Sequence, residues 1–400
     1  MNQPLFLHIV ERLEGFLSKL PTSIQKPVLQ ELTPLKQLFL KQRPPRLVLT
    51  GAHKLPVQEV VSALFAAAQP GDLSDVLMEV YRWQDMDVGG HGNVALLDAR
   101  GADAAARRKI EEELRRQPAD IFFHVIDGSS ARPVLARDLE TLAALVDVPR
   151  TAATAPAKVI GVSLLAPGRD QAEHNGHATA ERGAGQIKLQ AALDEMPNVR
   201  DQLLQVLEIQ LAGRGAPEAN PGATRLMGIL TKELPNEARV EMIRISRDRR
   251  AQEEIAQVLV KSTTAICTAI GAQPIPLADL PVLTTLQLVM VSGIMYIAGR
   301  ERSLRAATEF VAALGVNVGA GMALREGARA VLKFFPGWGN IVCGMVAGAG
   351  TYALGRAAIV YFLEGVSLKD ARRTYLRSRK KKEQRAELPP PTAERTPIEG

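Results

Sequence analysis

The stretch Arg46-Leu-Val-Leu-Thr-Gly51 decides the fold of the first half of the chain. It is a short apolar run that ends in glycine, a residue that commonly stops a strand at a turn. Apolar side chains then recur at helical spacing, at Val57, Val60, Val61, Leu64 and Phe65. The segment therefore predicts a strand, a loop and a helix in succession.

Three more apolar runs follow the first one, at Val94–Asp98, Ile121–Asp127 and Val159–Leu165. Segments with helical periodicity separate them, at residues 104–116 and 133–146. Strands that are apolar along their whole length and alternate with helices are typical of a parallel sheet that is buried on both faces. The first half of the chain is therefore predicted to be an α/β domain.

Beyond the fourth run the pattern is less regular. Residues 167–186 are polar and rich in glycine, which predicts a flexible loop. Residues 186–212 have the spacing of one long helix, and residues 225–230 are predicted to form a further strand.

The second half of the chain is predicted to be helical. Helical periodicity begins near Glu241, and two runs without charge follow, at Leu280–Gly299 and Phe334–Gly355. We expect four parts, which are N-terminal helices at 1–43, an α/β domain at 44–235, an all-α domain at 240–366, and a basic, proline-containing, disordered tail at 367–400.

The loop after the first strand is where a P-loop would bind phosphate. A working P-loop needs a second glycine, then a lysine that meets the phosphates, then a hydroxyl residue that holds Mg²⁺. Counted from Gly51, those positions hold Pro56, Val57 and Gln58. Proline has no N–H, valine has no charge, and glutamine is a poor magnesium ligand. Lys54, inside the loop, is a cation that could reach a phosphate.

The spacing from Gly51 to Leu64 resembles that of bacterial Era-like GTPases, without a gap. Asp98-Ala-Arg-Gly101 stands where that family has its Asp-x-x-Gly switch motif, and residues 119–127 are similar to the strand that follows it. The resemblance implies that Asp98 would act through Mg²⁺ and that the Gly101 amide would contact the γ-phosphate. In place of the guanine-reading Asn-Lys-x-Asp motif stands Ser163-Leu-Leu-Ala166.

Two of the three GTPase motifs are thus lost, so we expect a non-catalytic, P-loop-GTPase-like domain without a cofactor. Gly51, Lys54, Gln58, Asp98 and Gly101 would then be remnants of a nucleotide pocket. One alternative is an active GTPase with a divergent P-loop, for which GTP and Mg²⁺ would be the cofactors. Another is a structural envelope protein or a stress-linked interaction protein, in which the α/β domain only packs.

The helical half resembles a conserved domain of uncharacterised function that occurs behind Era-like GTPase domains and in YcjF-like inner-membrane proteins. The residues that carry this resemblance are Ala272–Leu277, Leu286–Val291, Phe335–Asn340 and Ala347–Arg356. The resemblance implies a bacterial protein at the cytoplasmic side of the inner membrane, or in the cytoplasm.

Both uncharged runs reach the length that crosses a bilayer, about 20 residues. Gly344, Gly348 and Gly355 would permit close helix approach in lipid or contact with a partner. Both runs are followed by basic segments. If both runs crossed the membrane, one of these segments would lie on the outer side, which contradicts the positive-inside tendency. Three arrangements stay open: transmembrane helices, peripheral membrane contact, and a soluble bundle docked on a protein partner.

The net charge of +6 is concentrated near the C-terminus. Basic residues there are candidates for contact with anionic headgroups or a partner, namely Arg372, Arg373, Arg377, Arg379, Lys380, Lys381 and Lys382. The rest of the chain is nearly neutral and aromatic residues make up only 4% of it, which argues against a nucleic-acid-binding core. No cysteine or histidine spacing is typical of metal ligands, so we expect no metal site.

Overall fold

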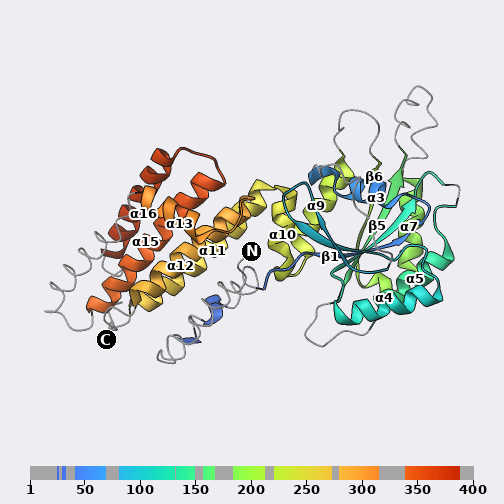
Figure 1. The fold of residues 1–400 in the computed structure, drawn as a ribbon, viewed down its shortest axis with the longest axis horizontal. Helices are drawn as coiled ribbons and strands as arrows, with labels where there is room; N and C mark the ends of the chain where they lie inside the picture. Colours follow the sequence, from blue (N-terminus) through green and yellow to red (C-terminus); the bar gives the residue numbers. More distant parts are fainter. Residues whose placement is uncertain are drawn as a thin grey trace, which may run out of the picture. The chain divides into compact units, whose positions relative to one another are not determined.

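The computed structural model describes residues 25–26, 29–32, 41–68, 81–130, 132–148, 156–166, 183–211, 220–272, 279–314 and 338–387. The chain divides into two compact units (Figure 1). One unit spans Lys41–Asp248, and the other combines Met1–Leu40 with Arg249–Gly400. The expected flexible loop at 167–182, most of the N-terminal helices and the last thirteen residues lie outside the described part.

The first unit is built on a six-stranded sheet. Its strands are β1 (Arg46–Gly51), β2 (Gln84–Asp87), β3 (Asn93–Asp98), β4 (Ile121–Asp127), β5 (Lys158–Leu165) and β6 (Leu203–Gln210). They lie in the order β2-β3-β1-β4-β5-β6, and neighbours are parallel except for the antiparallel pair β2 and β3 at one edge. The prediction of an α/β domain followed by a helical part is confirmed.

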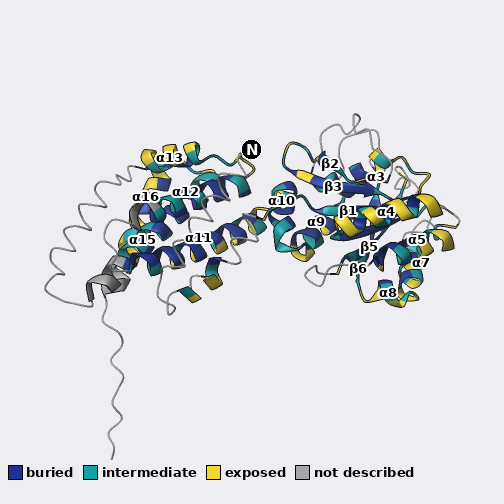
Figure 2. Ribbon diagram, turned by 60° about the horizontal axis from the view of Figure 1, so that its bottom comes forward, coloured by how far each residue is buried: buried dark blue, intermediate teal, exposed yellow. Residues whose placement is uncertain are grey.

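Helices cover both faces of this sheet, because successive side chains of a strand point to opposite faces. Leu47 and Leu49 pack on one face with α3 (Val57–Leu64), α9 (Pro221–Glu233) and α10 (Asn236–Ser246). Val48 packs on the other face with α4 (Ala104–Arg116), α5 (Ala136–Val146), α7 (Ala184–Asp194) and α8 (Pro197–Arg200). A short 3₁₀ helix, η2 (Ala66–Ala68), follows α3. The buried strands between the two helical layers are visible in Figure 2.

Two of the predicted elements are wrong. Residues 186–212 form α7, α8 and β6 instead of one helix, because Pro197 starts a new turn and the strand completes the sheet at its edge. Residues 225–230 lie inside α9 instead of a strand. The Asn220 side chain accepts a hydrogen bond from the Ala223 N–H, and Pro221 occupies the first turn, which are both helix-start signals.

The α/β unit also extends further than the expected limit at residue 235. Ala238, Met242 and Ile245 of α10 belong to the apolar core of the sheet. The Glu241 carboxylate on the same helix accepts a hydrogen bond from the backbone N–H of Asn93 at 2.9 Å. Helix α10 is therefore part of this unit, which ends at Asp248.

The second unit is helical. It contains α11 (Arg249–Gly271), α12 (Asp279–Ile297), α13 (Leu304–Ala313), α15 (Trp338–Phe362) and α16 (Leu368–Glu387). Helix α15 packs against α11, α12 and α16. The two uncharged runs lie largely within α12 and α15. Across the described residues, the structure contains no helix that is both long enough and apolar enough to cross a membrane.

The disordered tail expected at 367–400 is wrong for Leu368–Glu387, which form α16. Ala371 is fully buried and Tyr375 is buried against the rest of the unit. Packing of these two side chains, one turn apart, stabilises a helix whose composition alone indicates disorder.

Candidate functional site

The carboxyl ends of β1 and β3 lie side by side at the point where the order in which strands are added to the sheet reverses. Strand β1 lies between β3 and β4, so the chain builds the sheet first to one side of β1 and then to the other. In open α/β sheets, ligands bind in the crevice at such a switch point. Here the β1–α3 loop, Ala52–Pro56, and the residues that follow Asp98 at the end of β3 stand at this point of the sheet.

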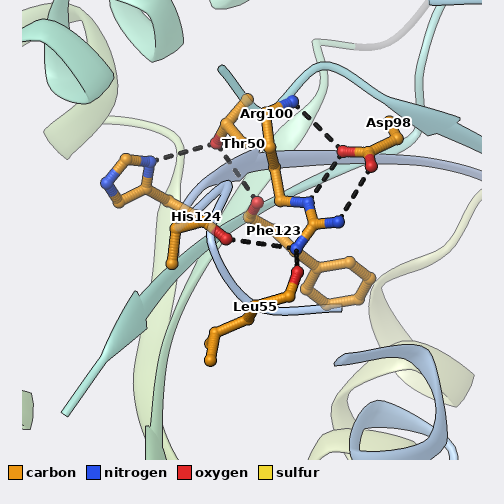
Figure 3. Close-up of polar contacts among 7 residues, drawn as sticks. Thr50, Leu55, Asp98, Arg100, Phe123 and His124 are labelled. Carbon is orange, nitrogen blue, oxygen red and sulfur yellow. Dashed lines mark hydrogen bonds and ion pairs between the residues drawn. The ribbon is translucent and has the colours of Figure 1, made fainter. Parts of the chain in front are cut away.

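The side chain of Arg100 occupies this position (Figure 3). Its Nε donates to Asp98 Oδ1 at 2.8 Å, and one terminal nitrogen donates to Asp98 Oδ2 at 2.9 Å. Its other terminal nitrogen donates to the backbone carbonyls of Ala52 at 3.1 Å and Leu55 at 2.9 Å. Arg100 is only 8% exposed. The guanidinium therefore ties the β3 end to the β1–α3 loop with four hydrogen bonds.

The β1–α3 loop accordingly presents acceptors to a cation, whereas a P-loop presents N–H donors to an anion. One of its amides is also used elsewhere, because the Ala52 N–H donates to the Val125 carbonyl of β4 at 2.8 Å. Gly51 lies against the same carbonyl with a positive φ of 93°, and a Cβ there would come within 2.1 Å of the oxygen. Gly51, expected as the first glycine of a P-loop, is thus the residue that lets β1 pack closely against β4.

The start of α3 is equally unlike a phosphate site. Pro56 is the N-cap residue and has no N–H, while Val57 is partly buried against the core of the sheet. Glu59 places a carboxylate in the first turn, where it interacts favourably with the helix dipole and would repel a phosphate. Lys54 and Gln58 are exposed.

The two residues of the expected switch motif, Asp98 and Gly101, both lie against other groups of the unit. Both Asp98 oxygens face the Arg100 guanidinium, and Oδ1 also accepts the Arg100 backbone N–H at 3.1 Å. Gly101 has a positive φ of 69°, and a Cβ at this position would lie 3.0 Å from His53 Cβ. An aspartate whose oxygens are both bound to a guanidinium, beside a loop that presents carbonyl acceptors, does not fit Mg²⁺ and a triphosphate.

The end of β5, where a GTPase would read the base, holds Ser163, Leu164, Leu165 and Ala166, of which the first two are buried. Leu164 is fully buried, and Ala166 donates its N–H to the Ser129 hydroxyl at 3.2 Å. The hydroxyl of Ser163 is buried without a hydrogen-bond partner among the described residues. It lies 2.3 Å from the point where a Cβ on Gly128 would sit, so the chain segments around it are tightly packed.

A buried polar pair lies beneath the site. The Thr50 hydroxyl lies 3.0 Å from Nδ1 of His124 and donates to the Phe123 carbonyl at 3.2 Å (Figure 3). Complete burial lowers the pKa of His124 to about 4. The imidazole is therefore neutral at pH 7 and fills the core of the sheet, as the position in a buried strand predicts.

The three glycines proposed for membrane or partner contact pack inside the helical unit instead. A Cβ on Gly344 would lie 2.7 Å from the Thr268 carbonyl of α11, and one on Gly348 would lie 2.0 Å from the Thr268 hydroxyl. A Cβ on Gly355 would lie 2.5 Å from Val260, also on α11. The missing side chains let α15 approach α11, so this surface is already occupied.

The seven basic residues proposed for membrane or partner contact all lie on α16, but on different sides of it. Six of them are exposed, namely Arg372, Arg373, Arg377, Lys380, Lys381 and Lys382. Arg379 is half-buried, and Lys382 places its ammonium 4.5 Å from the centre of the Tyr352 ring of α15. The last two therefore belong to the side of α16 that packs on the unit.

Sequence reasoning missed Arg100, the residue that occupies the site. The available signal was a cation two residues after Asp98, in a chain whose loop after Gly51 has Val57 at the position of a P-loop lysine. Such a cation can neutralise the aspartate when no metal does. Only the tertiary structure shows that its side chain also reaches the β1–α3 loop.

None of the protein-family models matches the chain. The chain is similar to Magnetosome membrane protein 22 of Magnetospirillum gryphiswaldense, with 28% identity over 139 residues. The match covers 32% of this chain and 70% of the magnetosome protein.

Proposed function

We propose that the α/β unit is a GTPase-like domain that does not bind nucleotide, and that the chain is a non-catalytic interaction protein at a membrane surface. The observation that carries the first part is the Arg100 guanidinium, bound to Asp98 and to the carbonyls of Ala52 and Leu55.

A phosphate at this position would need N–H donors and a cation directed toward it. The loop instead directs two carbonyl oxygens inward, and both are bound to Arg100. Binding of GTP would require Arg100 to leave and the Asp98 carboxylate to lose its partner. Breaking a buried pair of this kind costs about 3–5 kcal/mol before any contact with the ligand is made.

The carboxyl end of β5 supports the same proposal. A site that discriminates guanine needs polar groups that pair with the ring, and discrimination is lost when they are absent. Ser163, Leu164 and Ala166 stand at the end of β5, and the hydroxyl of Ser163 is buried. The residues at this strand end therefore support the proposal that no guanine nucleotide binds here.

The membrane part of the proposal is supported by the similarity to a protein whose name places it in the magnetosome membrane. It is also supported by the concentration of positive charge on α16. Charged helices that lie on the surface of a folded unit can attach to anionic lipid without spanning the bilayer.

Calorimetric titration of the full chain with GTP and with GDP, each with and without Mg²⁺, tests the first part. We expect no saturable heat up to about 1 mM nucleotide, a limit that corresponds to a binding free energy near −4 kcal/mol. Thermal unfolding at a large excess of GTP gives a second readout, since a bound ligand raises the stability of the folded state. Magnesium-dependent binding at micromolar concentration would overturn the proposal and establish an active GTP-binding protein with a divergent P-loop.

A further inference from the structure

Helix α16 is a folded, oriented element on the helical unit. Ser367 precedes it and accepts the Asp370 N–H at 3.2 Å, while its hydroxyl donates to the Asp370 carboxylate at 2.7 Å. This hydrogen bond lowers the pKa of Asp370. Ala371 and Tyr375 pack inward, with Tyr375 only 6% exposed. These contacts fix which side of the helix faces outward.

The whole net charge of the protein resides in this one helix. Residues 368–387 contain nine basic and three acidic side chains, a net charge of +6. The remaining residues of the chain contain forty basic and forty acidic side chains. The electrostatic field that the protein presents to a charged partner is therefore strongest at α16.

The basic residues of the outward side form a continuous stripe. Lys369, Arg373, Arg377 and Lys380 are all exposed and follow one another at spacings of four, four and three residues, which places them on one face of a helix. Leu376 lies among them and is 54% exposed. We call Lys369, Arg373, Leu376, Arg377 and Lys380 the outer face of α16.

We propose that the outer face of α16 binds a bilayer that contains anionic lipids, with Leu376 inserted beneath the headgroup phosphates. Lysine and arginine side chains near such a surface are attracted by its negative potential. At the membrane surface, charged headgroups lie directly above the apolar acyl chains. An apolar side chain surrounded by cations suits this boundary, because the cations contact the headgroups while the apolar side chain reaches the acyl chains. Binding of anionic lipid by α16 rests on the proposed function at a membrane surface, and it does not depend on the proposal that the α/β unit binds no nucleotide.

The composition of the outer face favours lipid over nucleic acid. Proteins that hold single-stranded nucleic acid combine basic side chains with exposed aromatic rings that stack on bases. Tyr375 is the sole aromatic residue of the described helix, and it is buried on the inner side. The exposed apolar residue is an aliphatic one, Leu376, which offers no stacking surface.

The test is co-sedimentation of the full chain with vesicles of phosphatidylcholine alone or mixed with phosphatidylglycerol. The test variant replaces four basic residues of the outer face, K369Q, R373Q, R377Q and K380Q. The matched control removes the same charge from other exposed positions of the helical unit, R249Q, R250Q, K261Q and R305Q. Circular dichroism of both variants establishes that α16 and its unit remain folded.

We expect the chain to bind only the anionic vesicles. Each basic residue near an anionic surface contributes about a fivefold factor, so the test variant should bind about 100-fold to 1,000-fold more weakly at low salt. The control should change binding by less than about tenfold, because its charges lie away from the outer face. The difference should shrink between about 0.05 M and 1 M salt, where the Debye length falls to about 3 Å.

Leu376→Ser separates insertion from charge attraction. It should weaken binding at high salt, where the electrostatic contribution is screened but burial of an apolar side chain persists. Equal loss in the test and control variants would overturn the proposal, as would binding to neutral vesicles with equal affinity. Binding of a homopolymeric RNA in preference to anionic vesicles would also overturn it. None of these outcomes depends on whether the α/β unit binds GTP, which calorimetry decides separately.

Discussion

Replacing Arg100 with methionine tests whether the guanidinium holds the candidate site together. Methionine retains much of the length of the side chain but removes all four hydrogen bonds to Asp98, Ala52 and Leu55. The two carbonyl oxygens then lose the guanidinium as a partner, and the Asp98 carboxylate keeps only the backbone N–H of residue 100.

The expected cost follows from the burial of the pair. The side chains of Arg100 and Asp98 are 4% and 21% exposed. Removing one member of a buried pair costs about 3–5 kcal/mol, and the partial exposure of Asp98 favours the lower end, near 3 kcal/mol. Replacing Asp98 with asparagine in the same chain removes the charge that Arg100 had balanced. The double variant should therefore be less destabilised than the two single effects predict, by about 1–2 kcal/mol.

The chain offers a reporter for this measurement. It contains two tryptophans, Trp83 and Trp338, which belong to different units. Trp338→Phe leaves Trp83, which packs against the core beneath α4 and α5, as the sole indole in the chain. Urea unfolding followed by its fluorescence then reports the α/β unit separately, which a chain of two units requires.

Arg115→Met provides the matched control. Arg115 also bonds a carboxylate, Glu111, at 3.1 Å, but its side chain is 51% exposed. Its loss should cost less than about 0.5 kcal/mol. If Arg100→Met were as mild as this control, or if the double variant were simply additive, the assignment of Arg100 as the group that occupies and closes the site would be refuted.

Three further outcomes are expected. Burial lowers the pKa of His124 from 6.5 to about 4, so the unfolded chain takes up a proton first as the pH falls. About 3 kcal/mol of stability should therefore be lost between pH 6.5 and pH 4, and denaturation curves of His124→Phe should lack this loss. Gly355→Leu should destabilise the helical unit by about 1–3 kcal/mol, since a Cβ there already meets Val260 at 2.5 Å. Unfolding followed by helical circular dichroism measures this loss, and an unchanged stability would contradict the contact between α15 and α11. Burial raises the pKa of Cys267 to about 12, so in a Cys343→Ser background a thiol reagent should react only after unfolding, and rapid reaction of the native protein would contradict the burial.

The sequence determined the class of fold in the first half because continuous apolar runs have few structural solutions. The runs that contain Leu47, Phe122 and Ile160 form adjacent parallel strands, as their pattern predicts. The sequence also showed that the loop after Gly51 does not fit a phosphate, since Pro56 lacks an N–H and Val57 lacks a charge in any fold. These inferences depend on properties that each residue carries by itself.

Tertiary contacts decided the elements that the sequence misassigned. Residues 203–210 became β6 because the edge of β5 provided hydrogen-bond partners for a strand. Helix α16 formed because Ala371 and Tyr375 found an apolar surface to pack against, although its composition suggests disorder. Local propensity is worth only a fraction of 1 kcal/mol per residue, so such contacts readily override it.

The occupant of the candidate site depended entirely on the three-dimensional arrangement. The sequence placed Asp98 and Gly51 at strand ends, and both are there. It did not indicate that Arg100 would reach the carbonyls of Ala52 and Leu55, which are forty-five or more positions away along the chain. A hydrogen bond depends on distances of about 3 Å between particular atoms, and residue order specifies such distances only through the fold that brings the two loops together.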